Sequence, residues 1–170
     1  MNCCDRNLRR PIIKMDLVKI PLIQPNGAKI NLSNNHGIYF WFSNNDELVY
    51  IGIATGVGGL KHRIVNQHLN SKYLEYRETK HTKKDTFQLK HAVERIAKDG
   101  KSIQKGIDKS AFRKAIGRAF KIKPGEETVK YIVKNMYLKV REIKNVEKLK
   151  VMEKKLIQKY RPCLNTNFLR

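Results

Sequence analysis

The sequence is short of cysteines and of long apolar runs, and each of these shortages argues against a class of protein. Cys3, Cys4 and Cys163 are an odd number without CxxC spacing, which argues against a disulfide framework and against a structural zinc site. No apolar run reaches about 18 residues, so a membrane-spanning helix is not expected. Residues 1–11 lack the apolar segment of a signal peptide, and we therefore expect a cytoplasmic protein.

What the sequence has in excess is positive charge. Lys and Arg number 36 against 15 Asp and Glu, a formal net charge of +21 over 170 residues. The excess is present in residues 71–128 and in the rest of the chain, so it belongs to folded surface and favours a groove that follows phosphates. Nucleic acid is the leading candidate partner, although charge alone also fits a protein that binds ribosomes or membranes.

The length suits one domain, and apolar periodicity predicts both strands and helices. Asn26-Gly27, between two short apolar runs, predicts an N-terminal β-hairpin. The predicted strands are 17–23, 28–32, 38–42, 49–53 and 129–143. Helices are expected at 60–70, at 87–98, from Asp108 or Ser110 to 120, and from an Asn145 cap to 160, where Arg161-Pro162 ends the helix.

Two triplets lie in the paired strands of the second predicted hairpin: Gly37-Ile38-Tyr39 and Tyr50-Ile51-Gly52. Side chains alternate between the faces of a strand, so a register that pairs Tyr39 with Gly52 puts both tyrosine hydroxyls on one face. A glycine opposite a tyrosine leaves room for a backbone or a substrate. Taken alone, the two residues fit ordinary strand tyrosines as well as a catalytic pair.

The last predicted helix carries a carboxylate on its apolar side. Glu153 stands four residues after Leu149 and four before Ile157, and both of these belong to the apolar stripe. A charge on a buried face is unfavourable unless it is paired or binds a cation. Glu153 is therefore either one partner of a structural salt bridge or a metal ligand.

The two triplets and the last predicted helix resemble the GIY-YIG nuclease family, which takes its name from the triplets. The resemblance covers roughly residues 36–70 and 129–167. It implies an α+β fold, a small core with a central antiparallel sheet flanked by helices. Residues 1–35, with the N-terminal β-hairpin, and a helical insertion at 71–128 are then additions to a single nuclease domain spanning 1–170.

The resemblance also implies an active site. Members of the family act with one divalent cation, Mg²⁺ or Mn²⁺, at each active site, and Glu153 matches its ligand. Tyr50 would take a proton from the attacking water with help from Tyr39, and Arg63 would stabilise the charge on the scissile phosphate. Asn165 matches an asparagine that members place near the active site. The products would carry a 5′-phosphate and a 3′-hydroxyl.

The histidine of the family pattern is displaced in this chain. It normally follows the arginine by four residues, but Gln67 holds that place and His68 comes next. On an ideal helix His68 lies away from Arg63, among apolar residues. His68 is therefore a candidate catalytic residue, with a packed core histidine as the alternative.

Recognition of DNA has to come from the additions to the core, because the chain has no room for a separate binding domain. This favours a type II restriction endonuclease that cuts double-stranded DNA at a short site. The alternatives are a sequence-tolerant or structure-specific nuclease of repair, recombination or phage metabolism, and a non-catalytic nucleic-acid-binding protein. With one active site per chain, a double-strand break needs a homodimer or two successive nicks. The candidate nucleic-acid contacts are cationic side chains on predicted helix surfaces: Lys61, Arg113, Lys114 and Arg118.

Overall fold

The computed structural model describes residues 16–22, 30–77 and 86–165, and the chain divides into two compact units. The first unit is formed by residues 1–65 and 132–170, and the second by residues 66–131. Each unit contains an antiparallel sheet and helices, in agreement with the predicted α+β class. In the described part of the chain, no helix is long and apolar enough to cross a membrane.

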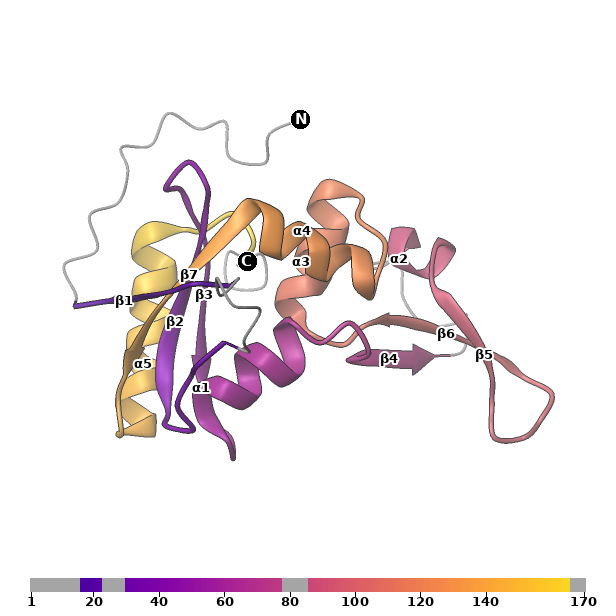
Figure 1. The fold of residues 1–170 in the computed structure, drawn as a ribbon, viewed down its shortest axis with the longest axis horizontal. Helices are drawn as coiled ribbons and strands as arrows, with labels where there is room; N and C mark the ends of the chain where they lie inside the picture. The colour runs from indigo at the N-terminus through magenta and orange to yellow at the C-terminus, as the bar shows by residue number, and fades with distance from the viewer. Residues whose placement is uncertain (1–15, 23–29, 78–85, 166–170) are drawn as a thin grey trace. The chain divides into compact units, whose positions relative to one another are not determined.

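The first unit is built on a four-stranded antiparallel sheet in which β2 is a central strand. The order is β1-β7-β2-β3, from β1 (Val18–Ile20), β7 (Met136–Glu142), β2 (Gly37–Ser43) and β3 (Leu48–Ala54). Helix α5 (Val146–Tyr160) lies along one face of this sheet (Figure 1). As predicted, Asn145 caps α5, accepting a hydrogen bond from Lys148 N at 2.8 Å, and the helix ends at Tyr160, with Arg161 as its C-cap.

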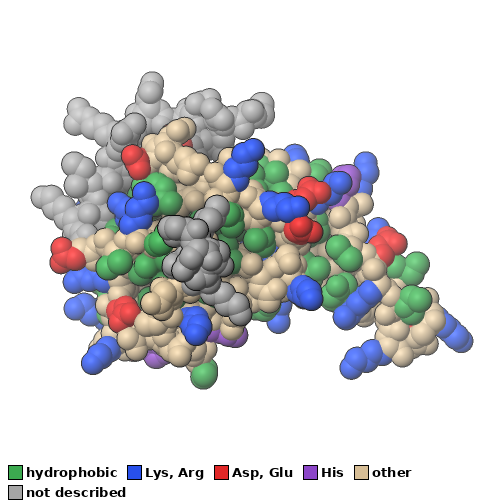
Figure 2. Space-filling model, in the orientation of Figure 1, with side chains coloured by type: hydrophobic (Ala, Val, Ile, Leu, Met, Phe, Trp, Pro, Cys, Tyr) green, Lys and Arg blue, Asp and Glu red, His purple; other side chains and the backbone are tan. Residues whose placement is uncertain are grey.

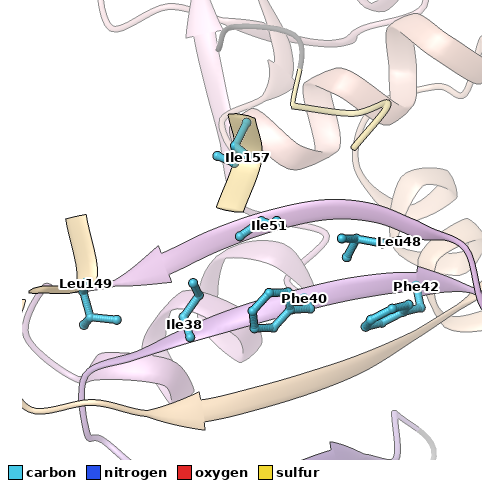
Figure 3. Close-up of a cluster of buried hydrophobic side chains, with 7 residues drawn as sticks. All are labelled: Ile38, Phe40, Phe42, Leu48, Ile51, Leu149 and Ile157. Carbon is cyan, nitrogen blue, oxygen red and sulfur yellow. The ribbon is translucent and has the colours of Figure 1, made fainter. Parts of the chain in front are cut away.

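Apolar side chains of β2 and β3 build the core against α5. Alternate residues of a strand point to opposite faces, so Tyr39 and Trp41 lie on the face away from α5, where both are also fully buried. A shift of register pairs Phe42 with Leu48 and brings Leu48 to the core side. The core cluster consists of Ile38, Phe40, Phe42, Leu48, Ile51, Leu149 and Ile157 (Figure 3).

The helix predicted at 60–70 begins as α1 (Gly59–Lys61) and continues as a π-helix, η1 (His62–His68). Carbonyl oxygens of the loop 33–35 accept hydrogen bonds of 2.9 Å from the first N–H groups of this helix. These bonds satisfy donors that the start of a helix leaves open. The loop therefore fixes the start of the helix that carries Arg63.

The second unit contains a three-stranded antiparallel sheet with the order β4-β6-β5. The strands are β4 (Leu74–Arg77), β5 (Val93–Ile96) and β6 (Ile103–Asp108). The helices are α2 (Thr86–Lys90) and α3 (Ala111–Phe120), and α4 (Glu126–Asn135) begins here and ends in the first unit. Of the two predicted caps of α3, Ser110 is the one observed, since its side chain accepts a hydrogen bond from Arg113 N at 3.3 Å.

A buried ion pair organises the second unit. The side chains of Arg113 and Asp108 are fully buried and joined by a hydrogen bond from Nη2 to Oδ1. The same guanidinium donates to the carbonyl oxygens of Gln67, Asn70 and Gly125. A buried charge is stable only when its hydrogen-bonding groups are satisfied in this way. The pair therefore links β6 and α3 to the chain segments on either side of them.

The predicted N-terminal hairpin is wrong in the part that the structure describes. β1 forms, but it pairs with β7, at the other side of the sheet from β3. Residues 30–32 are not in a strand, and the Asn26-Gly27 turn lies outside the described residues. A local turn signal does not decide which strand a segment joins when a distant partner is available.

Two later elements also differ from the prediction. Residues 93–96 form β5 instead of the end of a helix from 87, because their backbone pairs with β6. Residues 129–135 belong to α4, and the predicted strand begins only at Met136. The insertion at 71–128 is therefore not purely helical, since it contains a complete sheet.

Replacement of Gly59 by alanine is expected to destabilise the protein. Gly59 has φ +48°, and a Cβ there would collide with the carbonyl oxygens of Asn34 and Asn35. Gly56 is the matched control, because a Cβ on it meets nothing within 4 Å. We expect Gly59→Ala to lower the free energy of unfolding by about 1–3 kcal/mol, and Gly56→Ala to change it by less than about 0.5 kcal/mol. Urea denaturation measures both, and equal effects would contradict the described loop.

Candidate active site

Two buried tyrosines lie side by side on β2 and β3. Tyr39 is fully buried, Tyr50 is 8% exposed, and their ring centroids are 6.4 Å apart. Tyr39 pairs with Gly52, as predicted. A Cβ on Gly52 would collide with the ring and the hydroxyl of Tyr39. The glycine of the second triplet thus makes the space that the tyrosine of the first triplet fills.

Arg63, on the π-helix η1, is joined to this pair. Its Nε donates a hydrogen bond of 3.2 Å to Tyr39 Oη. Burial raises the pKa of Tyr39, whereas the charge and the hydrogen bond of Arg63 lower it. Burial also raises the pKa of Tyr50, and the Arg63 charge again opposes the rise. Both hydroxyls are therefore protonated at neutral pH, and an additional positive charge nearby would favour their ionisation.

Glu153 brings a carboxylate to the same site from α5. It is half-buried, and it accepts a hydrogen bond from the backbone of Ile53 in β3. Burial raises the pKa of this carboxyl, while Arg63 and the hydrogen bond lower it. Its charge also acts on both tyrosine hydroxyls. The carboxylate, the arginine and the two tyrosines therefore form one electrostatic cluster in the first unit.

Asn165 fastens the end of the described chain to the outer edge of β3. Its Oδ1 accepts from Ile51 N, and its Nδ2 donates to Ile51 O, both at 2.8 Å. Leu164 N adds a bond of 3.0 Å to Val49 O. Because both polar atoms of the Asn165 amide bind backbone, the described geometry gives this residue a structural function at the active-site strand. A direct catalytic role for Asn165 stays a prediction.

His68 belongs to the second unit, where it is fully buried. Its Nδ1 lies 2.7 Å from Ser110 Oγ, and its ring packs edge-on against Phe112 at a centroid distance of 5.4 Å. This environment agrees with the packed core histidine that the sequence left as an alternative. In the same turn, the carbonyl of Gln67 accepts from Arg113. A catalytic role for His68 stays a prediction.

The four predicted nucleic-acid contacts have different surroundings. The prediction that Arg113 lies on a helix surface is wrong, because its guanidinium is fully buried in the ion pair of the second unit. Lys114 is partly buried and binds Glu75 at 3.0 Å. Arg118 is half-buried, and Lys61 is exposed. Of the four, Lys61 has the exposure that a phosphate contact requires.

One arrangement of polar residues was missed from the sequence. On the sheet of the second unit, Arg95 stacks over Tyr76 with its Cζ 3.6 Å from the ring centroid, and it donates to Gln104. The residues were assigned to a helix and a loop, so their proximity was not predicted. Residues 93–96 read Val-Glu-Arg-Ile, which does not alternate between apolar and polar, so the local sequence carried no clear signal for this strand.

An arginine suited to phosphate, a carboxylate suited to a hard cation and a buried tyrosine pair lie together in the first unit, and their chemistry fits an enzyme that acts on phosphodiesters. The family model of the GIY-YIG catalytic domain matches residues 35–167. The chain therefore belongs to the GIY-YIG family and is a nuclease. The matched range contains both triplets, η1 and Glu153. No curated protein and no solved structure gives a significant match to this chain.

Nucleases of this family generally depend on a divalent metal ion. Within the described residues, no group of three or more His, Cys, Asp or Glu side chains is placed to hold one. A site with one half-buried carboxylate still fits Mg²⁺ or Mn²⁺, because Mg²⁺ commonly binds one or two carboxylates and takes its other ligands from waters and substrate phosphates. Glu153 is the residue of this cluster that fits the ion.

Asn165→Asp is expected to destabilise the fold by opening the edge of β3. The substitution keeps the shape of the side chain but removes the donor to Ile51 O and places a carboxylate beside that carbonyl. Loss of a buried hydrogen bond with an unsatisfied partner corresponds to about 1–3 kcal/mol of unfolding free energy. Asn45→Asp, in the exposed β2–β3 turn, is the control. A normal thermal transition for Asn165→Asp together with lost cleavage would instead favour a catalytic role.

Proposed function

We propose that the protein is a divalent-metal-dependent DNA endonuclease, a type II restriction enzyme that cuts duplex DNA at a short specific site. The observation that carries the chemistry is the hydrogen bond from Arg63 Nε to Tyr39 Oη, with Tyr50 beside it. This hydrogen bond joins the permanent charge of Arg63 to the Tyr39 hydroxyl. A tyrosine hydroxyl acts as a base only in its ionised form, which a neighbouring cation stabilises.

The two tyrosines act together on the attacking water. As the family resemblance implies, Tyr50 takes the proton of this water with the help of Tyr39, which requires that Tyr50 has first lost its own proton. The hydrogen bond from Arg63 stabilises an ionised Tyr39 more directly than an ionised Tyr50. The proton of the water is therefore taken up by a coupled pair of hydroxyls. Variants of each tyrosine measure how much each hydroxyl contributes to cleavage.

Arg63 and Glu153 stabilise charge on the phosphate. A guanidinium stays charged at any working pH, and its planar fork matches two phosphate oxygens. Glu153 would hold one Mg²⁺ or Mn²⁺, which when bound supplies Lewis-acid stabilisation of the charge that develops on the phosphate. The water oxygen bonds to phosphorus, the bond between phosphorus and the 3′ oxygen breaks, and that oxygen takes a proton from solvent, so the products are a 5′-phosphate and a 3′-hydroxyl.

The net charge of +21 supports a nucleic-acid substrate. Cutting at a specific site is proposed because residues 66–131 form a compact unit with its own sheet. This unit is available to recognise DNA, while the candidate active site belongs to the first unit. A double-strand break by one site per chain requires a homodimer or two successive nicks. A cytoplasmic location remains part of this proposal.

Digestion of a long duplex DNA of known sequence tests the proposal. The purified protein is incubated with Mg²⁺, beside an EDTA control, and the products are separated on a gel. Discrete bands in the Mg²⁺ lane establish a site-specific endonuclease, and sequencing of the ends gives the site. A metal-dependent smear favours the sequence-tolerant nuclease, and DNA that is retarded but intact favours a binding protein.

Tyr39→Phe and Tyr50→Phe are each expected to reduce cleavage by about 10²–10⁴-fold, the range for loss of general acid–base catalysis. Neither change removes a charge, so both variants should still bind DNA in Ca²⁺. Tyr137→Phe is the control, because its hydroxyl binds Asp46 at 2.6 Å outside the site. Gel-shift and single-turnover cleavage measure the two properties. Equal loss of binding and cleavage would argue against these roles.

Glu153→Gln is expected to abolish cleavage and to raise the melting temperature in EDTA. Burial raises the pKa of Glu153 in the folded protein, so the ionised carboxylate destabilises the fold at neutral pH. The difference in melting temperature between wild type and variant should shrink as the pH falls below the ordinary glutamate pKa. Glu153 is then protonated in both the folded and the unfolded protein. Active-site residues are often unfavourable for folding, so a variant that loses activity commonly gains stability.

Mg²⁺ should stabilise the wild-type protein and leave Glu153→Gln unchanged, since a ligand that binds only the folded state adds about 2.7 kcal/mol at 100 times its Kd. Glu147→Gln is the control: this carboxylate is exposed on the same helix and pairs with Lys150. Differential scanning fluorimetry over a Mg²⁺ series measures the shifts. A Mg²⁺ response in Glu153→Gln would assign the ion to other residues.

A further inference from the structure

The ribbon formed by β5 and β6 exposes large apolar side chains. Ile96 is 68% and Ile103 57% exposed, and the two are directly opposite each other, so they share one face of the ribbon. Val93, 51% exposed, lies on the other face of β5, with Arg95. Within the second unit, the turn of this ribbon extends away from the rest of the sheet (Figure 1). Neighbouring apolar side chains that remain exposed in a folded unit mark a surface for a partner.

Cations surround these apolar side chains. Lys98 and Lys101 are exposed in the ribbon turn, and hydrophobic and cationic side chains gather together at this end of the second unit (Figure 2). On the strands, the exposed acidic residue Glu94 is matched by Lys105 at 3.7 Å. The turn also holds Asp99, so between residues 93 and 105 the ribbon carries four cationic side chains, Arg95, Lys98, Lys101 and Lys105, against the two carboxylates Glu94 and Asp99. This excess of positive charge is complementary to a polyanion.

The ribbon turn is held in one conformation. The Asp99 carboxylate accepts hydrogen bonds of 2.9 Å from Lys101 N and Ser102 N, and a further one from Ser102 Oγ. Ala97 N closes the turn by donating to Ser102 O at 2.7 Å. These bonds lower the pKa of Asp99 to about 2, so the turn keeps its bonds at neutral pH. A preordered turn loses little conformational entropy on binding.

Arg95 is held on the other face of the ribbon with part of its guanidinium still available. The group stacks over Tyr76, and Gln104 Oε1 accepts from its Nε at 3.2 Å and from its Nη2 at 3.1 Å. Within the described residues, Gln104 takes two of the five N–H donors of an arginine. Gly106 makes the stack possible, because a Cβ there would come within 2.8 Å of the Tyr76 ring. The planar fork is therefore oriented before any ligand binds.

We propose that the β5–β6 ribbon enters the major groove of duplex DNA and that Arg95 reads a guanine there. The proposal takes from the proposed function only that duplex DNA is the substrate. The major groove of B-DNA admits a two-stranded β-ribbon, arginine forks pair with O6 and N7 of guanine, and apolar side chains contact thymine methyl groups. Duplex RNA does not fit, because its major groove is too narrow for side chains to read.

Binding of duplex DNA in Ca²⁺ tests the ribbon without cleavage. Lys98→Glu/Lys101→Glu reverses two charges in the ribbon turn, and Lys144→Glu/Lys148→Glu reverses two exposed lysines at the start of α5 as the control. Fluorescence anisotropy over a salt series measures affinity. We expect the ribbon variant to bind at least about tenfold more weakly and to lose about two units of salt slope, and the control to change less than about threefold.

Arg95→Lys tests the reading of guanine, because lysine keeps the charge and lacks the planar fork. Wild type and variant each select duplexes from a random pool in Ca²⁺, and the bound fraction is sequenced. We expect a wild-type motif in which the preference for one guanine falls about tenfold or more in the variant, with unchanged affinity for the unselected pool. Identical motifs in two proteins with matching thermal transitions would overturn the assignment to Arg95.

The ribbon proposal and the proposed function fail in different experiments. A ribbon variant that binds like the control overturns the ribbon proposal even where Mg²⁺-dependent cleavage is found. Ribbon-dependent binding without any cleavage supports the ribbon and overturns the proposed function. A dimer that Ile103→Asp dissociates while DNA binding is unchanged assigns the apolar surface to self-association and overturns the ribbon proposal.

Discussion

The outward edge of β3 is the constraint on which the first unit depends. An edge strand presents N–H and C=O groups that need partners, and here Leu164, Asn165 and Glu153 provide them from distant parts of the chain. The same hydrogen bonds that close the edge also bring a carboxylate to the strand that holds Tyr50. Stability and the proposed chemistry therefore share one set of contacts, and the half-buried Glu153 is the member that is unfavourable for folding.

Tyr39 is the point where the two triplets meet the helix. Its ring fills the space over Gly52, and its hydroxyl accepts from Arg63. Tyr39, Gly52 and Arg63 restrict one another. A larger residue in place of Gly52 would displace the Tyr39 ring, and the displaced ring would lose its hydrogen bond from Arg63. The loop 33–35 fixes the start of the helix that carries Arg63. A side chain held by several contacts of this kind is oriented before any substrate binds, as the proposed chemistry requires.

The second unit follows a different principle. Its interior is organised by the buried pair of Arg113 and Asp108, whose hydrogen bonds reach the carbonyls of Gln67 and Gly125. This polar centre fixes β6 at its buried end, while the other end of β6 pairs with β5 in the exposed ribbon. Arg113, which the sequence suggested for DNA contact, thus serves folding, whereas Arg95, in a strand that the sequence assigned to a helix, is the arginine proposed for recognition.

The sequence by itself determined the β2–β3 hairpin, the pairing of Tyr39 with Gly52, and α5 with its Asn145 cap, because strand alternation and helix caps are local. It also placed Glu153 on the apolar side of α5. Only the tertiary structure decided that β1 joins β7, that 93–96 is a strand, that Arg113 is buried and that Asn165 binds Ile51. These outcomes depend on partners far away in the chain, whose hydrogen bonds and burial outweigh the weak preferences of short segments.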